Sequence, residues 1–182
     1  MGVGLFGGAF DPPHNGHVAL VDAAEAAFGF DRLLVLVSED PGHKRTYAPA
    51  EARLQLASAA FPGREAELDP FARTVDMLRA RRFDDPVFLI GADQFAAFGS
   101  WKEPDAVLEL ARLGVATRPG YPLPSNCRSD RVSLFDIPEI DATSTGVRRR
   151  VAAGEPIDDL VPETVGALID ELGLYRLSDL RG

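Results

Sequence analysis

Val3-Gly-Leu-Phe-Gly-Gly-Ala-Phe-Asp-Pro-Pro-His-Asn-Gly-His17 begins with an apolar run, passes through a glycine- and proline-containing turn and ends where a helix should start. Residues 3–6 are typical of a buried strand, and residues 15–28 carry apolar side chains at the spacing of one helical face. Residues 33–37 are apolar at every position, as in a parallel strand covered on both faces. These segments predict the first strand–helix–strand unit of a parallel sheet.

The same alternation continues to the end of the chain. Further strands are expected at residues 67–69, 87–90, 113–117 and 132–137, and further helices at 49–61, 72–83, 104–113, 144–153 and 162–172. Alternating strands and helices favour an α/β fold, here a Rossmann-like doubly wound parallel sheet with helices on both faces. The length of 182 residues suits one domain, residues 1–182, with surface loops at 38–49 and 118–131.

Composition limits the partners and the compartment. The net charge of −9 argues against a nucleic-acid partner, because a phosphate backbone requires a basic face. The longest purely aliphatic run, residues 33–37, is too short to cross a bilayer, so no membrane association is expected. Cys127 is the only cysteine, so an intrachain disulfide is excluded and a cytoplasmic location is expected. The oligomeric state stays open, and a homo-oligomer is compatible with the sequence.

The turn that ends at His17 combines features of a phosphate-binding site. Glycines let the backbone approach a ligand closely, and Gly16 allows tight packing where the helix begins. His14 and His17 are three residues apart in the first helical turn, so both rings can face one ligand. The helix N-terminus adds unpaired amides and a partial positive charge. Two alternatives remain: histidines that cap or pack the turn, and a zinc site for which only His43 could add a third imidazole.

Polar residues also follow the later strands, at the edge where open α/β sheets bind ligands. Ser144 or Thr145 can cap a helix and also offer a hydroxyl to a phosphate, and Arg148 lies one helical turn further on. A capped helix with a basic exposed face is the alternative. The other residues in such positions are Lys44 (alternatively a solvated lysine), Asp93 (alternatively a helix cap) and Arg118 (alternatively a loop salt bridge).

Taken together, these motifs resemble a known family. Gly7-Gly-Ala-Phe-Asp-Pro-Pro-His-Asn-Gly-His17 is similar to the HxGH signature of the nucleotidyltransferase superfamily, in the form carried by the bacterial nicotinate-nucleotide adenylyltransferases. The similarity spans nearly the whole chain in the family's order. It continues at Pro41-Gly-His-Lys44, Leu89-Ile-Gly-Ala-Asp-Gln94, Trp101, Arg118-Pro-Gly-Tyr-Pro-Leu123, Ser144-Thr-Gly-Val-Arg148 and Gly173-Leu-Tyr-Arg176.

The resemblance implies transfer of AMP from ATP to nicotinate mononucleotide, giving nicotinate adenine dinucleotide and pyrophosphate in NAD biosynthesis. The expected partners are ATP, carrying Mg²⁺, and a pyridine mononucleotide, and no protein metal site is expected. The resemblance assigns catalysis to His14, His17, Lys44 and Arg148. It assigns ATP binding to Gly7, Gly8, Phe10, Gly16, Asp93, Arg118, Ser144 and Thr145, and acceptor binding to Asp11, Thr74 and Trp101. Arg73 is a further acceptor-binding candidate that the family pattern does not supply.

One stretch departs from the family's pattern. Where the family usually carries Ser-Tyr-Thr, this chain has Ala72-Arg-Thr74, so Arg73 replaces a tyrosine. We expect Arg73 to pair with an acidic group on the acceptor, such as the nicotinate carboxylate, or to be an exposed arginine at a helix N-terminus. Trp101 either stacks on the pyridine ring, as the resemblance implies, or belongs to the core.

Three rival functions remain open from sequence. The same chemistry could serve another acceptor, such as nicotinamide mononucleotide or phosphopantetheine. The chain could instead bind nucleotides as a regulator without turnover. A relative of the aminoacyl-tRNA synthetases shares an HIGH-type signature, but the short acidic chain argues against that reading.

Overall fold

The computed structural model describes residues 2–42, 45–117 and 130–180. The chain divides into two compact units, each assembled from separate segments. Unit 1 comprises Met1–Gly7, Ala19–Leu34 and Phe71–Glu139, and unit 2 comprises Gly8–Val18, Val35–Pro70 and Ile140–Gly182. The single domain expected from the length stays a prediction.

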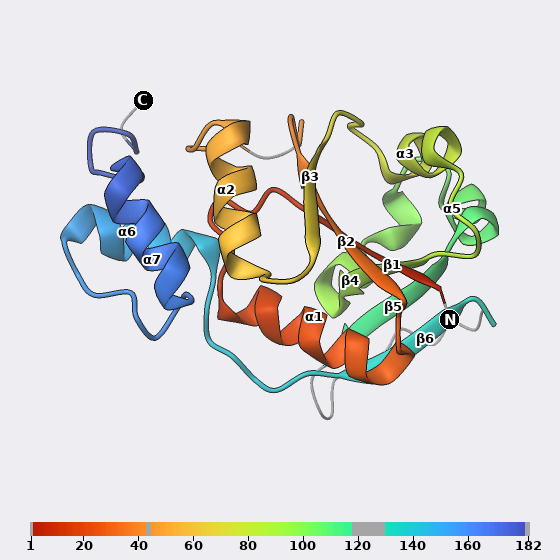
Figure 1. Cartoon of the computed structure of the whole chain (residues 1–182). Coiled ribbons are helices and arrows are strands. Elements are labelled where there is room, and N and C mark those ends of the chain that lie inside the picture. Colours follow the sequence, from red (N-terminus) through yellow and green to blue (C-terminus); the bar gives the residue numbers. More distant parts are fainter. Residues whose placement is uncertain (1, 43–44, 118–129, 181–182) are drawn as a thin grey trace. The chain divides into compact units, whose positions relative to one another are not determined.

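Six strands form one parallel sheet in the order β3-β2-β1-β4-β5-β6 (Figure 1). From β1 the chain adds β2 and β3 in one direction along the sheet, and it then adds β4, β5 and β6 on the other side of β1. The strand order therefore reverses between β1 and β4, as in a doubly wound fold. The predicted α/β, Rossmann-like fold class is therefore confirmed. The strands are β1 (Val3–Gly8), β2 (Arg32–Ser38), β3 (Glu65–Asp69), β4 (Val87–Gly91), β5 (Arg112–Thr117) and β6 (Val132–Asp136).

Helices connect these strands, and two of them have the bounds expected from sequence. These are α1 (Asn15–Phe28) and α6 (Ser144–Ala153). A short helix and a 3₁₀ turn after β4 were not expected, because their few residues show no helical periodicity. The remaining helical segments are α2 (Ala50–Ala60), α3 (Thr74–Arg81), α4 (Ala92–Ala96), η1 (Phe98–Ser100), α5 (Pro104–Leu110) and α7 (Glu163–Leu172).

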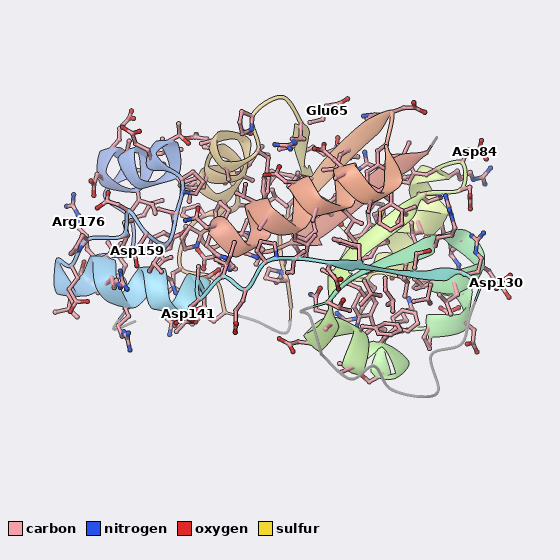
Figure 2. All side chains as sticks on the ribbon, turned by 90° about the horizontal axis from the view of Figure 1, so that it is seen from below. Glu65, Asp84, Asp130, Asp141, Asp159 and Arg176 are labelled. Carbon is pink, nitrogen blue, oxygen red and sulfur yellow. The ribbon has the colours of Figure 1, made fainter. Side chains whose placement is uncertain are left out.

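Unit 1 is built on the parallel pairing of β1 with β4, β4 with β5, and β5 with β6. The central strands are apolar and buried, as their sequences predict. Gly114 in β5 permits the closest packing, because a Cβ there would lie 2.7 Å from Leu89 Cδ2. At the amino ends of the strands, Asp85 pairs with Arg112 at 3.2 Å and with Arg131 at 3.0 Å. Figure 2 labels the preceding residues, Asp84 and Asp130, at this end of unit 1.

Unit 2 contains β3, α2, α6 and α7. Helix α2 packs against both β3 and α7. Helix α6 ends at Gly154, whose φ of +69° places it in the left-handed region that favours glycine. Arg150 near the end of α6 donates a 2.6 Å hydrogen bond to Asp159, which Figure 2 labels. This bond joins α6 to the segment that connects it with α7. In the same segment, the Leu160 carbonyl accepts from the Asn15 amide at the start of α1.

Candidate active site

The turn between β1 and α1 is shaped by an unusual residue, Phe10. Its φ is +48° and its ring is buried, with 2% of the residue exposed. The ring packs edge-on against His17, with centroids 5.3 Å apart, and against Phe61 at 5.7 Å. A Cβ on Gly8 would lie 2.9 Å from the Phe10 ring, so Gly8 makes room for this ring. The Phe10 ring, for which Gly8 leaves room, therefore packs against His17. The sequence analysis had expected the glycines to let a ligand approach the backbone.

His14 and His17 lie face to face, as the three-residue spacing predicts. Their ring centroids are 3.7 Å apart with an interplanar angle of 29°. The backbone N–H of His14 donates to Nδ1 of His17 at 3.2 Å, which requires that Nδ1 carry no proton. Neutral His17 therefore carries its proton on Nε2, which is the only donor atom of its ring.

Burial keeps His14 neutral. Desolvation lowers the pKa of His14 from 6.5 to about 4, so the ring is uncharged near pH 7. Its Nδ1 is buried without a hydrogen-bond partner among the described residues, which favours the tautomer protonated on Nε2. The ring lies over Gly16, where a Cβ would approach Nδ1 to 3.1 Å. The turn thus carries two neutral imidazole rings, each with its proton on Nε2.

The helix N-terminus is less open than the sequence suggested. The Asn15 amide donates to the Leu160 carbonyl at 2.9 Å, and the Asn15 side chain donates to the Asp159 carbonyl at 3.1 Å. The His14 amide is used by His17. These bonds anchor the start of α1 to the connection before α7, at the expense of two amides that we expected to be free for an anion.

Asp11 links the turn to distant segments of unit 2. The residue is 4% exposed, and its carboxylate accepts three hydrogen bonds. The donors are the Tyr47 amide at 2.7 Å, the Ala48 amide at 3.1 Å and the Tyr175 hydroxyl at 2.9 Å. Burial, and then the negative charge of Asp11, raise the pKa of Tyr175, so this phenol stays protonated. The carboxylate predicted to bind the acceptor is already occupied by protein donors, and that predicted role remains untested.

Arg148 lies beside the same turn. Its Nη1 donates to the Asp11 carbonyl at 2.6 Å, its Nη2 donates to Thr145 Oγ1 at 3.1 Å, and its Cζ lies 4.6 Å from the Tyr47 ring centroid. A guanidinium has five N–H groups. Among the described residues, recorded hydrogen bonds use two of those of Arg148, so three remain for a ligand. Arg148 therefore lies beside the signature turn, residues 7–17, and its predicted contact with the ATP phosphates stays a prediction.

The hydroxyls at the start of α6 have different roles from those expected. The helix cap is Thr143, whose Oγ1 accepts from the Gly146 amide at 3.0 Å, and neither Ser144 nor Thr145 caps the helix. Ser144 donates its proton to the Pro12 carbonyl at 2.8 Å. Thr145 accepts from Arg148, so its own proton remains available to a phosphate oxygen.

Arg53 is a buried cation that the sequence analysis missed. It is 1% exposed and donates to four backbone carbonyls. Burial lowers the pKa of its guanidinium, and the charge of Asp11 opposes that effect. A charged residue on the apolar face of a predicted helix was the available signal. The acceptors are Ala48 at 3.1 Å, Ala9 at 2.8 Å, Ser38 at 2.7 Å and Glu39 at 2.9 Å. Arg53 therefore fixes the ends of the loop that follows β2.

In unit 1, two of the candidate residues follow β4. Asp93 is exposed in the first turn of α4, and Gly91 occupies the N-cap position, so the capping alternative for Asp93 is wrong. Trp101 is half-buried and packs edge-on against Phe98 at 5.3 Å and Phe88 at 6.3 Å. Trp101 therefore borders the core without being enclosed by it.

The remaining candidates of unit 1 lie at the start of α3 and the end of β1. Arg73 is the N-cap residue of α3, is exposed, and donates only to the Ala72 carbonyl at 3.0 Å among the described residues. Thr74 is half-buried in the first turn. A Cβ on Gly7 would lie 3.2 Å from Phe88 Cζ, so Gly7 accommodates this ring.

Some predictions fall outside the described residues. They concern His43 and Lys44 in the loop after β2, and Arg118 and Cys127 in the loop after β5. Within residues 2–42, 45–117 and 130–180, no group of three His, Cys, Asp or Glu side chains could hold a metal ion. The same residues include no helix long and apolar enough to span a membrane.

Comparison with known proteins assigns the chain to a class and then to a family. The sequence model described as cytidylyltransferase-like matches residues 5–150, which include the signature turn and the start of α6. A Thermus thermophilus protein named "Probable nicotinate-nucleotide adenylyltransferase" is 40% identical over 97% of this chain and 100% of its own length. A protein of the same name from Rubrobacter xylanophilus is 36% identical over 97% and 92%, respectively. The chain belongs to the nicotinate-nucleotide adenylyltransferase family.

Solved structures agree on the fold. The nicotinic acid mononucleotide adenylyltransferase of Plasmodium falciparum, complexed with NaAD, aligns with a TM-score of 0.77 at 16% identity, covering 95% of this chain and 96% of that one. The same protein complexed with APC gives a TM-score of 0.74 at 15% identity, with the same coverage. At these identities the likeness concerns the arrangement of the sheet and helices.

Proposed function

We propose that the chain transfers AMP from ATP to nicotinate mononucleotide, forming nicotinate adenine dinucleotide and pyrophosphate. The observation that carries this proposal is the convergence of His14, His17, Thr145 and Arg148 on one turn of unit 2. Among the described residues, the recorded bonds leave N–H groups of Arg148 and the hydroxyl proton of Thr145 available to an anion. The names of the relatives, at up to 40% identity over nearly the whole chain, support the choice of acceptor.

The reaction needs no covalent intermediate. A phosphate oxygen of the mononucleotide attacks the α-phosphorus of ATP, a new P–O bond forms, and the bond from the α-phosphorus to the bridging oxygen breaks to release pyrophosphate. The attacking phosphate is already an anion, so no protein base is required. Catalysis then consists of holding the reactants in line and stabilising charge on the transferring group.

His17 and His14 act on the transferring phosphoryl group in this proposal. The proton on Nε2 of His17 is oriented by the bond from the His14 amide to Nδ1. A neutral His14, stacked at 3.7 Å, adds a second donor without placing a full charge against the neutral His17 ring. Gly7, Gly8, Phe10 and Gly16 act indirectly, by shaping the turn that carries these rings.

The departing pyrophosphate is bound from α6. Arg148 supplies its remaining N–H groups and Thr145 its hydroxyl proton, whereas Ser144 holds the helix to the turn through Pro12. We extend the ATP site to Lys44, Arg118 and Asp93 on the basis of the sequence motifs. Mg²⁺ is proposed to travel with ATP and to be held by phosphate oxygens and water.

Arg73, Thr74 and Trp101 are proposed to hold the acceptor. Arg73 is an exposed cation without a carboxylate partner among the described residues, and Trp101 presents a partly exposed aromatic surface. Asp11 contributes by positioning the turn. We place the protein in the cytoplasm, as its single cysteine and its substrates favour. The absence of a nucleic-acid partner and the homo-oligomeric state stay predictions.

A purified-enzyme assay tests the proposed function. ATP or CTP is mixed with nicotinate mononucleotide, nicotinamide mononucleotide or phosphopantetheine, and pyrophosphate and the joined product are measured. We expect the ATP and nicotinate mononucleotide pair to give the highest kcat/KM. Preference for another acceptor would overturn the acceptor assignment, and absence of turnover with every pair would leave a nucleotide-binding protein.

A further inference from the structure

Two arginines contact the ring of Tyr47 in unit 2. The Cζ atom of Arg45 lies 5.0 Å from the ring centroid, and that of Arg148 lies 4.6 Å from it. Both distances are within the range of cation–π attraction, and a guanidinium on an aromatic ring keeps its N–H edges free for anions. Tyr47 therefore gathers two positive charges at one place in a chain whose net charge is −9.

The ring is held in place by the turn that carries the histidines. The Tyr47 amide donates to the Asp11 carboxylate at 2.7 Å, and Arg148 donates to the Asp11 carbonyl at 2.6 Å. Asp11 thus fixes Tyr47 and Arg148 relative to each other. The ring is half-buried, so one part of it is supported by protein while the rest is available for contact.

Among the described residues, Arg45 has no other recorded attachment that would explain its position. It is exposed, and within the described residues no hydrogen bond or carboxylate partner is recorded for its guanidinium. A solvated arginine without a partner would gain little from approaching a second cation. The Tyr47 ring offsets part of that repulsion, and a polyanion that contacts both guanidiniums would offset the rest.

We propose that Arg45 is a second guanidinium of the polyphosphate site, positioned by Tyr47 and binding the β- and γ-phosphates of ATP and the pyrophosphate that leaves. This assignment rests on the proposed function, in which ATP is the donor. Arg148, held by Asp11, and Arg45, held by Tyr47, would act on the same anion. Arg45 contacts substrate in this proposal, and Tyr47 is a positioning residue.

Calorimetric binding of inorganic pyrophosphate, ATP and AMP to the full chain tests the proposal. Arg45→Ala is compared with Arg149→Ala, which removes the same charge from a residue next to Arg148. We expect Arg45→Ala to weaken pyrophosphate and ATP about tenfold, the size of one charge-assisted contact, while AMP, which lacks the β- and γ-phosphates, changes less than about twofold. Arg149→Ala should bind all three ligands as the wild type does.

Tyr47 variants test the positioning. Tyr47→Phe keeps the aromatic ring and should bind pyrophosphate with wild-type affinity. Tyr47→Leu removes the ring and should bind pyrophosphate more weakly. In the Tyr47→Leu background, Arg45→Ala should add little further loss, because the two act as a unit. Thermal unfolding of each variant establishes that it is folded.

The outcomes separate this proposal from the proposed function. Equal pyrophosphate affinity of Arg45→Ala and Arg149→Ala would overturn the assignment of Arg45, and an equal loss for AMP would overturn the β,γ-phosphate contact. A wild type that binds ATP and pyrophosphate but forms no dinucleotide would overturn the acceptor chemistry alone. A wild type that binds neither ligand would overturn both.

Discussion

The hydroxyl of Tyr175 donates a 2.9 Å hydrogen bond to Oδ1 of Asp11, joining residues 164 positions apart in the sequence. Tyr175 is 1% exposed, and its φ of +61° is rare for a residue with a side chain. The segment after α7 therefore completes the hydrogen bonds of the carboxylate that shapes the signature turn. This bond gives a physical reason for the tyrosine in Gly173-Leu-Tyr-Arg176.

Tyr175→Phe tests that connection. Removing the hydroxyl leaves a buried carboxylate oxygen with one donor fewer, so the free energy of unfolding should fall by about 1–3 kcal/mol. Urea denaturation measures this change. Tyr47→Phe is the matched control, because no hydrogen bond of the Tyr47 hydroxyl is recorded among the described residues. Equal stability of the two variants would contradict a structural role for the Tyr175 hydroxyl.

His14 makes stability depend on pH. Burial lowers its pKa from 6.5 to about 4, so between these values the unfolded chain binds a proton that the folded chain excludes. The free energy of unfolding should therefore fall as pH decreases from about 6.5 to about 4, with a contribution from His14 of up to about 3 kcal/mol. Denaturation at several pH values should show a shallower decline for His14→Asn than for the wild type. Identical slopes would show that His14 titrates normally.

The two hydroxyls at the start of α6 should separate into different functions. Thr145→Val removes the proton available to a phosphate, so the KM for ATP should rise about three- to tenfold with little change in Tm. Ser144→Ala removes the bond to the Pro12 carbonyl, so its main effect should be a lower Tm. Steady-state kinetics and thermal unfolding distinguish the two. The reverse pattern would show that Ser144 contacts the phosphate.

Arg73 is expected to act on the acceptor alone. If its guanidinium pairs with the nicotinate carboxylate, Arg73→Ala should raise the KM for nicotinate mononucleotide by about tenfold and leave that for ATP nearly unchanged. Arg79→Ala is a suitable control, since Arg79 lies on the same helix in an exposed pair with Glu103. A similar rise in both KM values would exclude a specific acceptor contact.

Local patterns predicted much of this structure, and distant contacts explain what they missed. Helices α1 and α6 have their predicted bounds because periodicity and capping residues act within a few positions. The capping residue of α6 is Thr143, one position before the expected hydroxyl, and Ser144 instead donates to the Pro12 carbonyl, 132 positions away in the sequence. The sequence analysis assigned Asp11 to ligand binding because its hydrogen-bond donors are far from it in the sequence. Only folding brings Tyr47, Ala48 and Tyr175 to its carboxylate.

Transfer of label from ATP tests the central claim most directly. The purified chain is incubated with nicotinate mononucleotide and ATP labelled at the α-phosphate, and the label is followed into the dinucleotide, in parallel with His17→Ala. We predict that the wild type incorporates α-label and releases unlabelled pyrophosphate, and that His17→Ala keeps the fold but loses at least about a hundredfold in kcat, as expected for a lost transition-state donor. Absence of the α-label from the dinucleotide, or full incorporation of the label by folded His17→Ala, would contradict AMP transfer assisted by His17.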